Sequence, residues 1–142
     1  MAHPVLTAAR RIAGNWVFLY GGVALAAWDL FLDPLMVAQG NWTWVVTGAH
    51  VPFQPEIPLS NTFGWLLSGM FLIGVLHLIT PREKRKGGAT FLVTDVFLLW
   101  TLFSSFIGNL FFFSRPGVAF FAGGIFGIVL APYFFNRWLG RP

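Results

Sequence analysis

The sequence predicts an all-α integral membrane protein, a helical bundle with four transmembrane helices and with both termini in the cytoplasm. Hydrophobic residues make up 56% of the 142-residue chain and charged residues only 10%, whereas soluble domains carry about 25% charged residues. A domain of this length exposes most of its surface, which so few charges could not cover in water. The chain has no cysteine, which excludes a secreted disulfide framework. Lipid is therefore the predicted solvent.

Four apolar runs are long enough to cross a bilayer, which takes about 20 residues. They form a single transmembrane domain, with spans at residues 12–32, 62–79, 89–113 and 118–135. We expect Pro34 to end the first span, because the residue before a proline disfavours helix. Asn61 is expected to cap the second span and Pro81 to stop it. Pro132 lies inside the fourth span, where it predicts a kink.

The basic residues predict the orientation. Eight of the nine lie before the first span, in the turn at residues 80–88 or after the last span, and only Arg115 lies elsewhere. Because cytoplasmic loops are enriched in Lys and Arg, the termini and this turn are predicted on the cytoplasmic side of a bacterial inner membrane. The distribution does not fit a face that binds nucleic acid. A signal peptide cleaved near residue 26 is the alternative for the N-terminus, but it would strand residues 28–34 outside the membrane.

The outer loop, residues 34–60, is too long for a simple connection. It contains Trp42 and Trp44. Tryptophans at this position are typical of the aromatic belt at a membrane surface, and they are equally able to line a binding site. The sequence alone leaves both interpretations open.

Asp29 and Asp33 are the candidates for chemistry, since an ionisable residue inside a span is a functional-site hypothesis by default. They are four residues apart and therefore share one helix face. Burial, their mutual repulsion and the negative end of the helix dipole all disfavour two charges there, so we expect the pair to retain a proton. A carboxyl in that state can donate a proton. The alternative is a capping or inter-helix hydrogen-bonding role at the outer boundary.

Other polar and small residues are assigned structural roles. His77 and Asp95 flank the basic turn, and we expect them to form a buried structural pair between neighbouring helices rather than a catalytic one. Small residues recur every four positions along the fourth span and predict close packing of another helix, with a groove for lipid or pigment as the alternative; they are Ala119, Gly123, Gly127 and Ala131. No metal site is predicted, because the three histidines lack ligand spacing.

Three ordered blocks carry a resemblance to a known family. They are AAWDLFLDPLMV at residues 26–37, GNWTW at residues 40–44 and IPLSNTFGW at residues 57–65. Together they resemble the bacterial and archaeal carotenoid biosynthesis membrane family that includes carotenoid 1,2-hydratases and bisanhydrobacterioruberin hydratase. The resemblance covers nearly all of this chain and corresponds to about the C-terminal half of the family.

The resemblance implies water addition to the terminal C1–C2 double bond of an acyclic carotenoid, without a cofactor. A protonated Asp29 or Asp33 would then protonate the alkene as a general acid. The aromatic faces nearby would stabilise the cation that forms. The residues expected to contact the substrate are Trp28, Trp42, Trp44, Asn61 and Trp65.

Two hypotheses of different classes follow. In the first, the chain is a carotenoid hydratase acting within membrane lipid. In the second, it is a shortened, non-catalytic relative that binds pigment or lipid as a structural subunit of a larger membrane complex. A homo-oligomer or other membrane subunits would then supply the missing helices.

Overall fold

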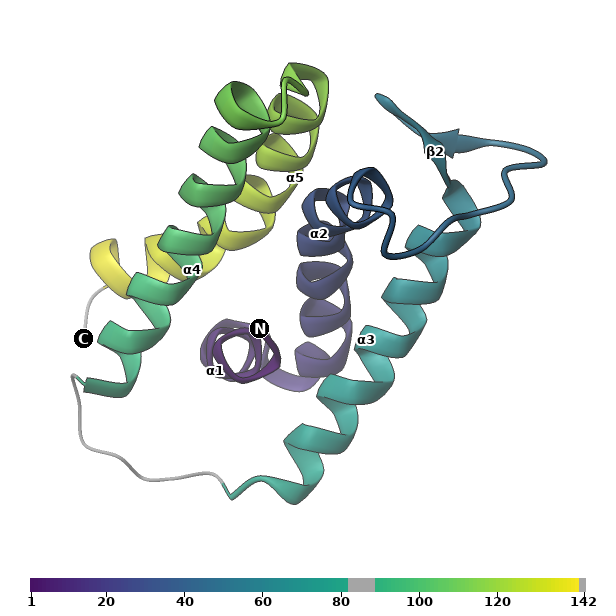
Figure 1. The fold of residues 1–142 in the computed structure, drawn as a ribbon. Helices are drawn as coiled ribbons and strands as arrows, with labels where there is room; N and C mark the ends of the chain where they lie inside the picture. Colours follow the sequence, from purple (N-terminus) through teal and green to yellow (C-terminus); the bar gives the residue numbers. More distant parts are fainter. Residues whose placement is uncertain (82–88, 141–142) are drawn as a thin grey trace.

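A computed structural model describes residues 1–81 and 89–140 of the chain, which are almost entirely helical (Figure 1). The basic turn predicted at residues 80–88 lies, beyond Pro81, outside the described residues. Within the described ranges, four helices are long and apolar enough to cross a bilayer, namely Gly14–Ala38, Leu59–Ile79, Phe91–Phe112 and Pro116–Leu139. The predicted all-α membrane bundle is confirmed.

The central spanning helix is α2 (Val17–Ala38). It lies between α3 (Leu59–Ile79) on one side and α4 (Ala89–Ile107) with α5 (Pro116–Phe134) on the other (Figure 1). Of the α2 span 61% is buried, against 11% of the α3 span and 17% of the α4 span. The core of the protein is therefore built around α2, while α3 and α4 present most of their surface to lipid.

Two glycines of α2 allow the close approach of α3. A Cβ atom placed on Gly21 would lie 2.5 Å from the side chain of Ile73, and one placed on Gly22 would lie 2.9 Å from the backbone nitrogen of Met70. Real Cβ atoms do not approach other atoms so closely, and small residues at such crossings are how membrane helices reach contact distance. The helix α2 also contacts α5, where the ring centroids of Phe31 and Phe126 lie 6.4 Å apart.

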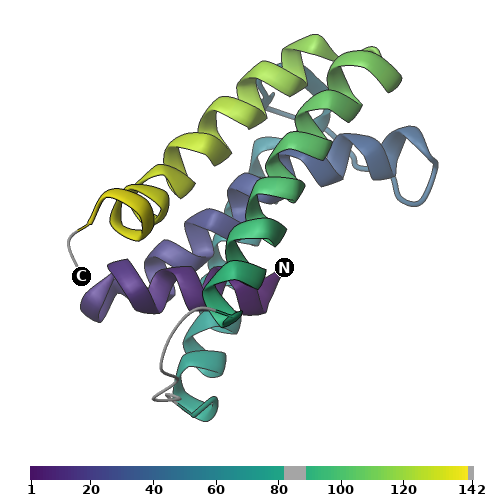
Figure 2. The ribbon, with the colours of Figure 1, turned by 90° about the vertical axis from the view of Figure 1, so that its left-hand side faces the viewer.

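An amphipathic helix that the sequence reasoning missed, α1 (Ala2–Ile12), precedes the first span. It is joined to α2 by a single 3₁₀ turn, Gly14–Trp16. It contacts all four spanning helices and runs across their ends rather than alongside them (Figure 2). Val5 and Ala9 on its apolar face are fully buried. The sequence indicated only that this segment carries two arginines before the first span. An 11-residue helix is too short to be recognised as a transmembrane span.

The first span does not stop at Pro34, contrary to the expectation from sequence, because α2 continues to Ala38. A proline within a helix deprives the carbonyl four residues earlier of its hydrogen bond. That carbonyl belongs to Leu30, and the side-chain nitrogen Nε2 of Gln54 donates to it at 2.8 Å. The outer loop thus replaces the bond that proline removes.

A short antiparallel hairpin, which the sequence did not predict, lies within the outer loop. It pairs β1 (His50–Val51) with β2 (Gln54–Pro58). The Glu56 side chain forms an ion pair with Arg115, which lies between α4 and α5. Phe53, held at φ 63° in the hairpin turn, packs against Gly117. These contacts attach the outer loop to the start of α5.

The third and fourth spans both end in wider helical turns. A π-helical segment, Gly108–Phe112, follows α4, and another, Phe135–Leu139, follows α5. Between α4 and α5 the chain reverses at Ser114, whose φ is 53°, and α5 begins at Pro116. Proline suits this first helical position, where its missing N–H would have no helical partner.

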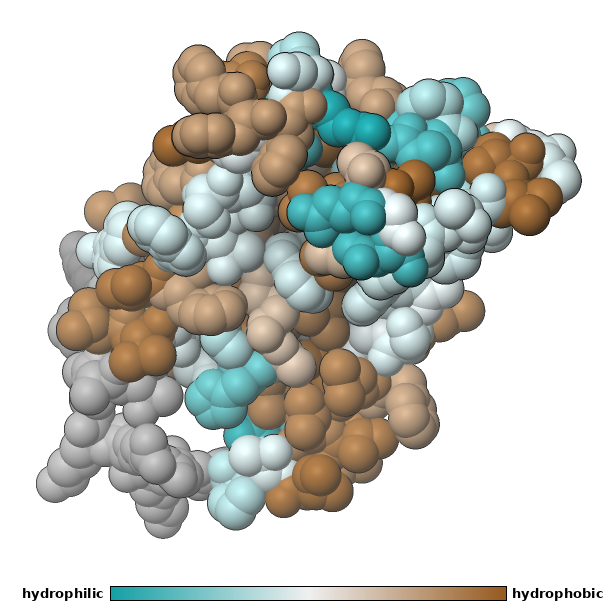
Figure 3. Space-filling view, viewed as in Figure 1, coloured by the Kyte–Doolittle hydropathy of each residue, from teal (hydrophilic) through white to brown (hydrophobic). Residues whose placement is uncertain are grey.

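The surface agrees with a protein surrounded by lipid. Hydrophobic side chains cover the lower part of α3 in the view of Figure 3. Hydrophilic ones gather mainly in the upper half, over the end of α2 and the loop that follows it, with a smaller patch beside α1. The polar surface therefore concentrates where the spans end.

Candidate functional site

The candidate site lies in the second half of α2, where Asp29 and Asp33 face α3. Both are buried, with 2% and 1% of their surface exposed. One helical turn separates them, so their side chains project from the same face as the sequence predicts. Both carboxyl groups lie beside one atom, the amide nitrogen of Asn61. Two buried carboxylates this near each other would repel, so the arrangement suits a pair that holds a single proton.

Side chains from two other segments donate to the carboxyl pair. The indole nitrogen Nε1 of Trp42 donates to Asp33 Oδ1 at 3.0 Å. The amide nitrogen Nδ2 of Asn61 donates to Asp33 Oδ2 and lies 3.4 Å from Asp29 Oδ2. Asp29 Oδ1 is buried and receives no hydrogen bond from any described residue. The pair thus has one carboxylate with both oxygens bonded and one oxygen left for a further partner.

The local sequence explains how Trp42 returns to α2. The helix ends at Ala38 with Gln39 as its C-cap, and the next residue, Gly40, adopts φ 71°, a conformation that costs glycine little. The Asn41 side-chain nitrogen then donates to Met36 Sδ at 3.4 Å and to Gln39 Oε1 at 3.2 Å. These bonds hold the chain in a tight reversal, which brings the next residue, Trp42, over Asp33.

Asn61 does not cap α3, contrary to the expectation from sequence. The helix begins two residues earlier, at Leu59, and the side chain of its N-cap residue, Pro58, makes no capping hydrogen bond. Asn61 therefore lies within the first turn, and its amide points sideways to the carboxyl pair instead of to the backbone of its own helix. It is the residue of α3 that connects this helix to the candidate site.

The remaining predicted contact residues lie at different distances from the carboxyl pair. Trp44 is 40% exposed. Trp28 is half-buried and packs against the core. Trp65 is half-buried one turn after Asn61 on α3. The structure thus brings Trp42 and Asn61 to the carboxyl pair, whereas no hydrogen bond joins Trp28, Trp44 or Trp65 to it among the described residues.

In the described part of the chain, the hydrogen bonds of His77 and Asp95 go to other residues, so their direct pairing stays a prediction. Arg10 Nε donates to His77 Nδ1 at 3.2 Å, and the Arg10 terminal nitrogen Nη2 donates to the backbone oxygens of His77 and Thr80. This arginine thereby satisfies carbonyls at the C-terminus of α3. The helix α1 lies between α3 and α4, the two helices that carry His77 and Asp95 (Figure 1).

Asp95 is instead part of a polar cluster between α4 and α5. The Tyr133 hydroxyl donates to Asp95 Oδ1 at 2.6 Å. Arg137 Nε lies 3.2 Å from Asp95 Oδ2, in an ion pair whose N–H is not aligned for a hydrogen bond. Asp95 and Tyr133 are buried. A buried carboxylate is costly unless it is paired and hydrogen-bonded, and both conditions are met here.

The row of small residues on α5 packs closely over only part of its length. Ala119 is fully buried, and a Cβ atom on Gly123 would lie 2.9 Å from the ring of Phe106. A Cβ atom on Gly127 would meet nothing within 4 Å, and Ala131 is only half-buried. The helices α4 and α5 diverge along this part of α5 (Figure 2), so close packing of another helix at Gly127 stays a prediction.

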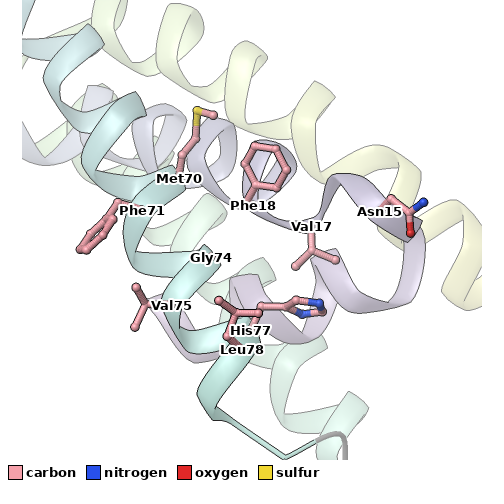
Figure 4. A pocket seen from close by; sticks show the side chains of 9 residues that line it. All are labelled: Asn15, Val17, Phe18, Met70, Phe71, Gly74, Val75, His77 and Leu78. Atoms are coloured by element: carbon pink, nitrogen blue, oxygen red, sulfur yellow. The ribbon is translucent and has the colours of Figure 1, made fainter.

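A pocket of about 470 Å³ lies between the start of α2 and the end of α3. Its lining is apolar apart from two residues, and it comprises Asn15, Val17, Phe18, Met70, Phe71, Gly74, Val75, His77 and Leu78. The ring of Phe18 and the imidazole of His77 lie between the two helices, whereas Phe71 and Val75 point away (Figure 4). Twelve helical residues, about 18 Å, separate Val17 from Asp29. The pocket is therefore distinct from the carboxyl pair.

Gln54 is the residue near the site that sequence reasoning missed. It is fully buried, and its carbonyl oxygen Oε1 has no hydrogen-bond partner among the described residues. The available signal was an uncharged amide in an otherwise apolar and proline-rich loop. That signal is weak, because nothing in the order of residues indicates that the loop folds back onto Leu30. In the described part of the chain no group of three metal-ligating side chains occurs.

Comparison with known proteins identifies the family of the chain. A family model described as "Carotenoid biosynthesis protein" matches residues 2–130. No curated protein and no solved structure matches the chain. The matched region contains α1, the outer loop with its hairpin, and every residue that contacts the carboxyl pair. The chain therefore belongs to the carotenoid biosynthesis protein family.

Proposed function

We propose that this protein adds water to the terminal C1–C2 double bond of an acyclic carotenoid. The observation that carries the proposal is the buried pair Asp29 and Asp33, which accepts hydrogen bonds from Trp42 and Asn61. An unactivated alkene reacts with water only after protonation, and a carboxylic acid in an apolar site is a suitable donor. Membership of a carotenoid biosynthesis family supplies the class of substrate.

The reaction would proceed in two steps. A proton held by the carboxyl pair is transferred to C2 of the alkene, the π bond breaks, and a tertiary cation forms at C1. Water then bonds to C1 and returns one proton to the carboxylate, so the pair is regenerated and the net change is the addition of one water. Asp33, which accepts two hydrogen bonds, suits the role of the carboxylate. Asp29 Oδ1, which accepts none, suits the role of the donor.

Access to the pair requires the outer loop to move. Trp42 and Asn61 cover the carboxyl groups, so an end group of the substrate reaches them only when the outer loop opens, and Trp42 bonds to Asp33 again once the substrate is in place. Residues 43–49 contain no helix or strand, and segments with few regular hydrogen bonds open at low cost. Trp44 lies at the exposed margin of the site, where its ring could also stabilise a cation by up to about 2 kcal/mol.

The proposed setting is the cytoplasmic membrane of a bacterium, with both termini on the cytoplasmic side. The outer loop and Arg115 lie at one end of the bundle, whereas Arg10 and Arg137 lie at the other. The excess of basic residues at the second end supports this orientation.

The direct test is expression in a host that accumulates lycopene. Pigments are extracted and separated by chromatography, and their masses are measured. We expect the wild-type chain to yield products heavier by one water, and the Asp29→Asn and Asp33→Asn variants to yield none. Glu56→Gln is the matched control, because it removes a carboxylate from the same end of the protein without touching the pair. Full hydration by either aspartate variant at wild-type protein level would contradict the mechanism.

A second candidate function is a non-catalytic subunit that binds pigment or lipid. It is favoured by the low burial of α3 and α4 and by the apolar pocket between α2 and α3. In the same host, this candidate predicts that purified protein retains lycopene of unchanged mass. The hydratase proposal instead predicts turnover of the pigment, so one pigment extraction distinguishes the two functions.

A further inference from the structure

Two arginines from opposite ends of the chain meet over one aromatic ring at the end of the bundle where α1 lies. The guanidinium carbon of Arg11, on α1, lies 4.9 Å from the centroid of the Phe91 ring. That of Arg137, after α5, lies 5.5 Å from the same centroid. In Figure 2 the end of α1 and the end of α5 come together at the left of the molecule. Contact with the ring stabilises each cation and partly offsets their mutual repulsion.

Most of the hydrogen-bonding capacity of these two arginines is unused. Arg11 donates through Nε to Asn136 Oδ1 at 2.7 Å, and Arg137 is paired through Nε with Asp95. The terminal nitrogens of both side chains make no hydrogen bond to any described residue. Asp95 is the one carboxylate paired with them among the described residues, so these three side chains together carry a net charge of +1.

Arg11 and Arg137 lie at the depth expected for lipid phosphates. Arg11 is exposed, and the side chain of Arg137 is 28% exposed. The apolar residues Leu92, Val93 and Val96 are exposed on the adjacent turns of α4, and Trp138 is exposed beside Arg137. Tryptophan and arginine at the end of an apolar span are typical of the headgroup region. An acyl chain could therefore lie along α4 while its headgroup faces the arginines.

We propose that Arg11 and Arg137 form a binding site for the phosphate of an anionic phospholipid. Guanidinium groups bind phosphate oxygens through paired N–H donors, and the unused terminal nitrogens are of this kind. Binding would bridge α1 and the end of α5, two segments that are far apart in sequence. The site is separate from the carboxyl pair, and the proposal does not depend on hydratase activity.

The test measures lipid binding by the purified full-length protein in detergent at low salt. The probes are phosphatidylglycerol and phosphatidylcholine, and binding is followed by native mass spectrometry. We expect phosphatidylglycerol to bind preferentially, and Arg11→Gln to weaken its binding by about five-fold, the effect of one basic residue at a membrane surface. Arg115→Gln, at the opposite end of the bundle, is the matched control and should leave binding unchanged.

Three results would overturn the proposal. The first is equal binding of the two lipids, and the second is an equal loss in Arg11→Gln and Arg115→Gln. The third is inorganic phosphate binding as tightly as the lipid, which would make this a site for a free oxyanion. Because Arg137→Gln would leave Asp95 unpaired and could unfold the protein, Arg11→Lys serves as the second variant. It should retain more phosphatidylglycerol binding than Arg11→Gln, since it keeps the charge.

Discussion

Gln54 donates a hydrogen bond to the backbone oxygen of Leu30, the carbonyl that Pro34 deprives of its helical partner. This bond between the outer loop and α2 allows the helix to continue past a proline. Asp33, which immediately precedes Pro34, therefore lies inside the helix and on the same face as Asp29. The geometry of the candidate site depends on a residue that contacts neither carboxylate.

Replacing Gln54 with leucine should destabilise the protein. The buried Leu30 carbonyl would lose its donor, which typically costs about 1–3 kcal/mol. Removing Gln54 Oε1, which is buried without a partner, offsets part of that loss. The free energy of unfolding in detergent micelles measures the net effect. In a Pro34→Ala background, where residue 34 again has an N–H for Leu30, the cost should fall, and equal costs in both backgrounds would contradict this account.

Glycines 22 and 127 should respond in opposite ways to added side chains. Gly22→Val would push α3 away from α2 and should lower the free energy of unfolding by about 1–3 kcal/mol. Gly127→Ala adds a methyl group in open space and should raise it by up to about 1 kcal/mol, because alanine favours helix. Thermal unfolding of the two variants in the same detergent compares them directly. If Gly127→Ala were destabilised instead, the result would indicate that another helix packs closely against Gly127, as the sequence predicts.

Trp42→Phe should slow hydration while preserving the aromatic ring. The substitution removes the N–H that Asp33 accepts at 3.0 Å, and a hydrogen bond to a charged group contributes about 1.5–3 kcal/mol. We expect the rate of pigment hydration to fall about ten-fold or more. Trp100→Phe, on the exposed face of α4, is the control and should leave the rate unchanged. Equal hydration rates for the wild type, Trp42→Phe and Trp100→Phe would show that the Trp42 N–H does not contribute to the reaction.

Tyr133→Phe should affect stability and leave hydration unchanged. Its hydroxyl donates to the buried Asp95, so the variant should lose about 1–3 kcal/mol of unfolding free energy. The cluster lies at the opposite end of the bundle from Asp29 and Asp33, so the folded variant should hydrate pigment at the wild-type rate. Denaturation and pigment assays on one preparation provide both measurements. A hydration rate that falls without any loss of stability would contradict this expectation and show that the Asp95 cluster influences the carboxyl pair.

Composition and spacing were sufficient to predict the membrane class and the shared face of the two aspartates. Both follow from local rules, since span length reflects bilayer thickness and residues four apart align on a helix. The partners of His77 and Asp95 could not be predicted in this way. They depend on α1, whose crossing position is decided by tertiary packing against four helices. The role of Gln54 could not be predicted for the same reason, because its hydrogen-bond partner lies 24 residues away in the sequence.

The helix α1 also constrains the order in which the protein assembles. Arg10 bonds to residues 67 to 71 positions later in the chain, and Arg11 bonds to a residue 125 positions later. During synthesis, which proceeds from the N-terminus, α1 therefore lacks these partners until α3, and finally the segment after α5, have emerged. Although α1 precedes all four spans in the sequence, its contacts are complete only after the last of them has been made.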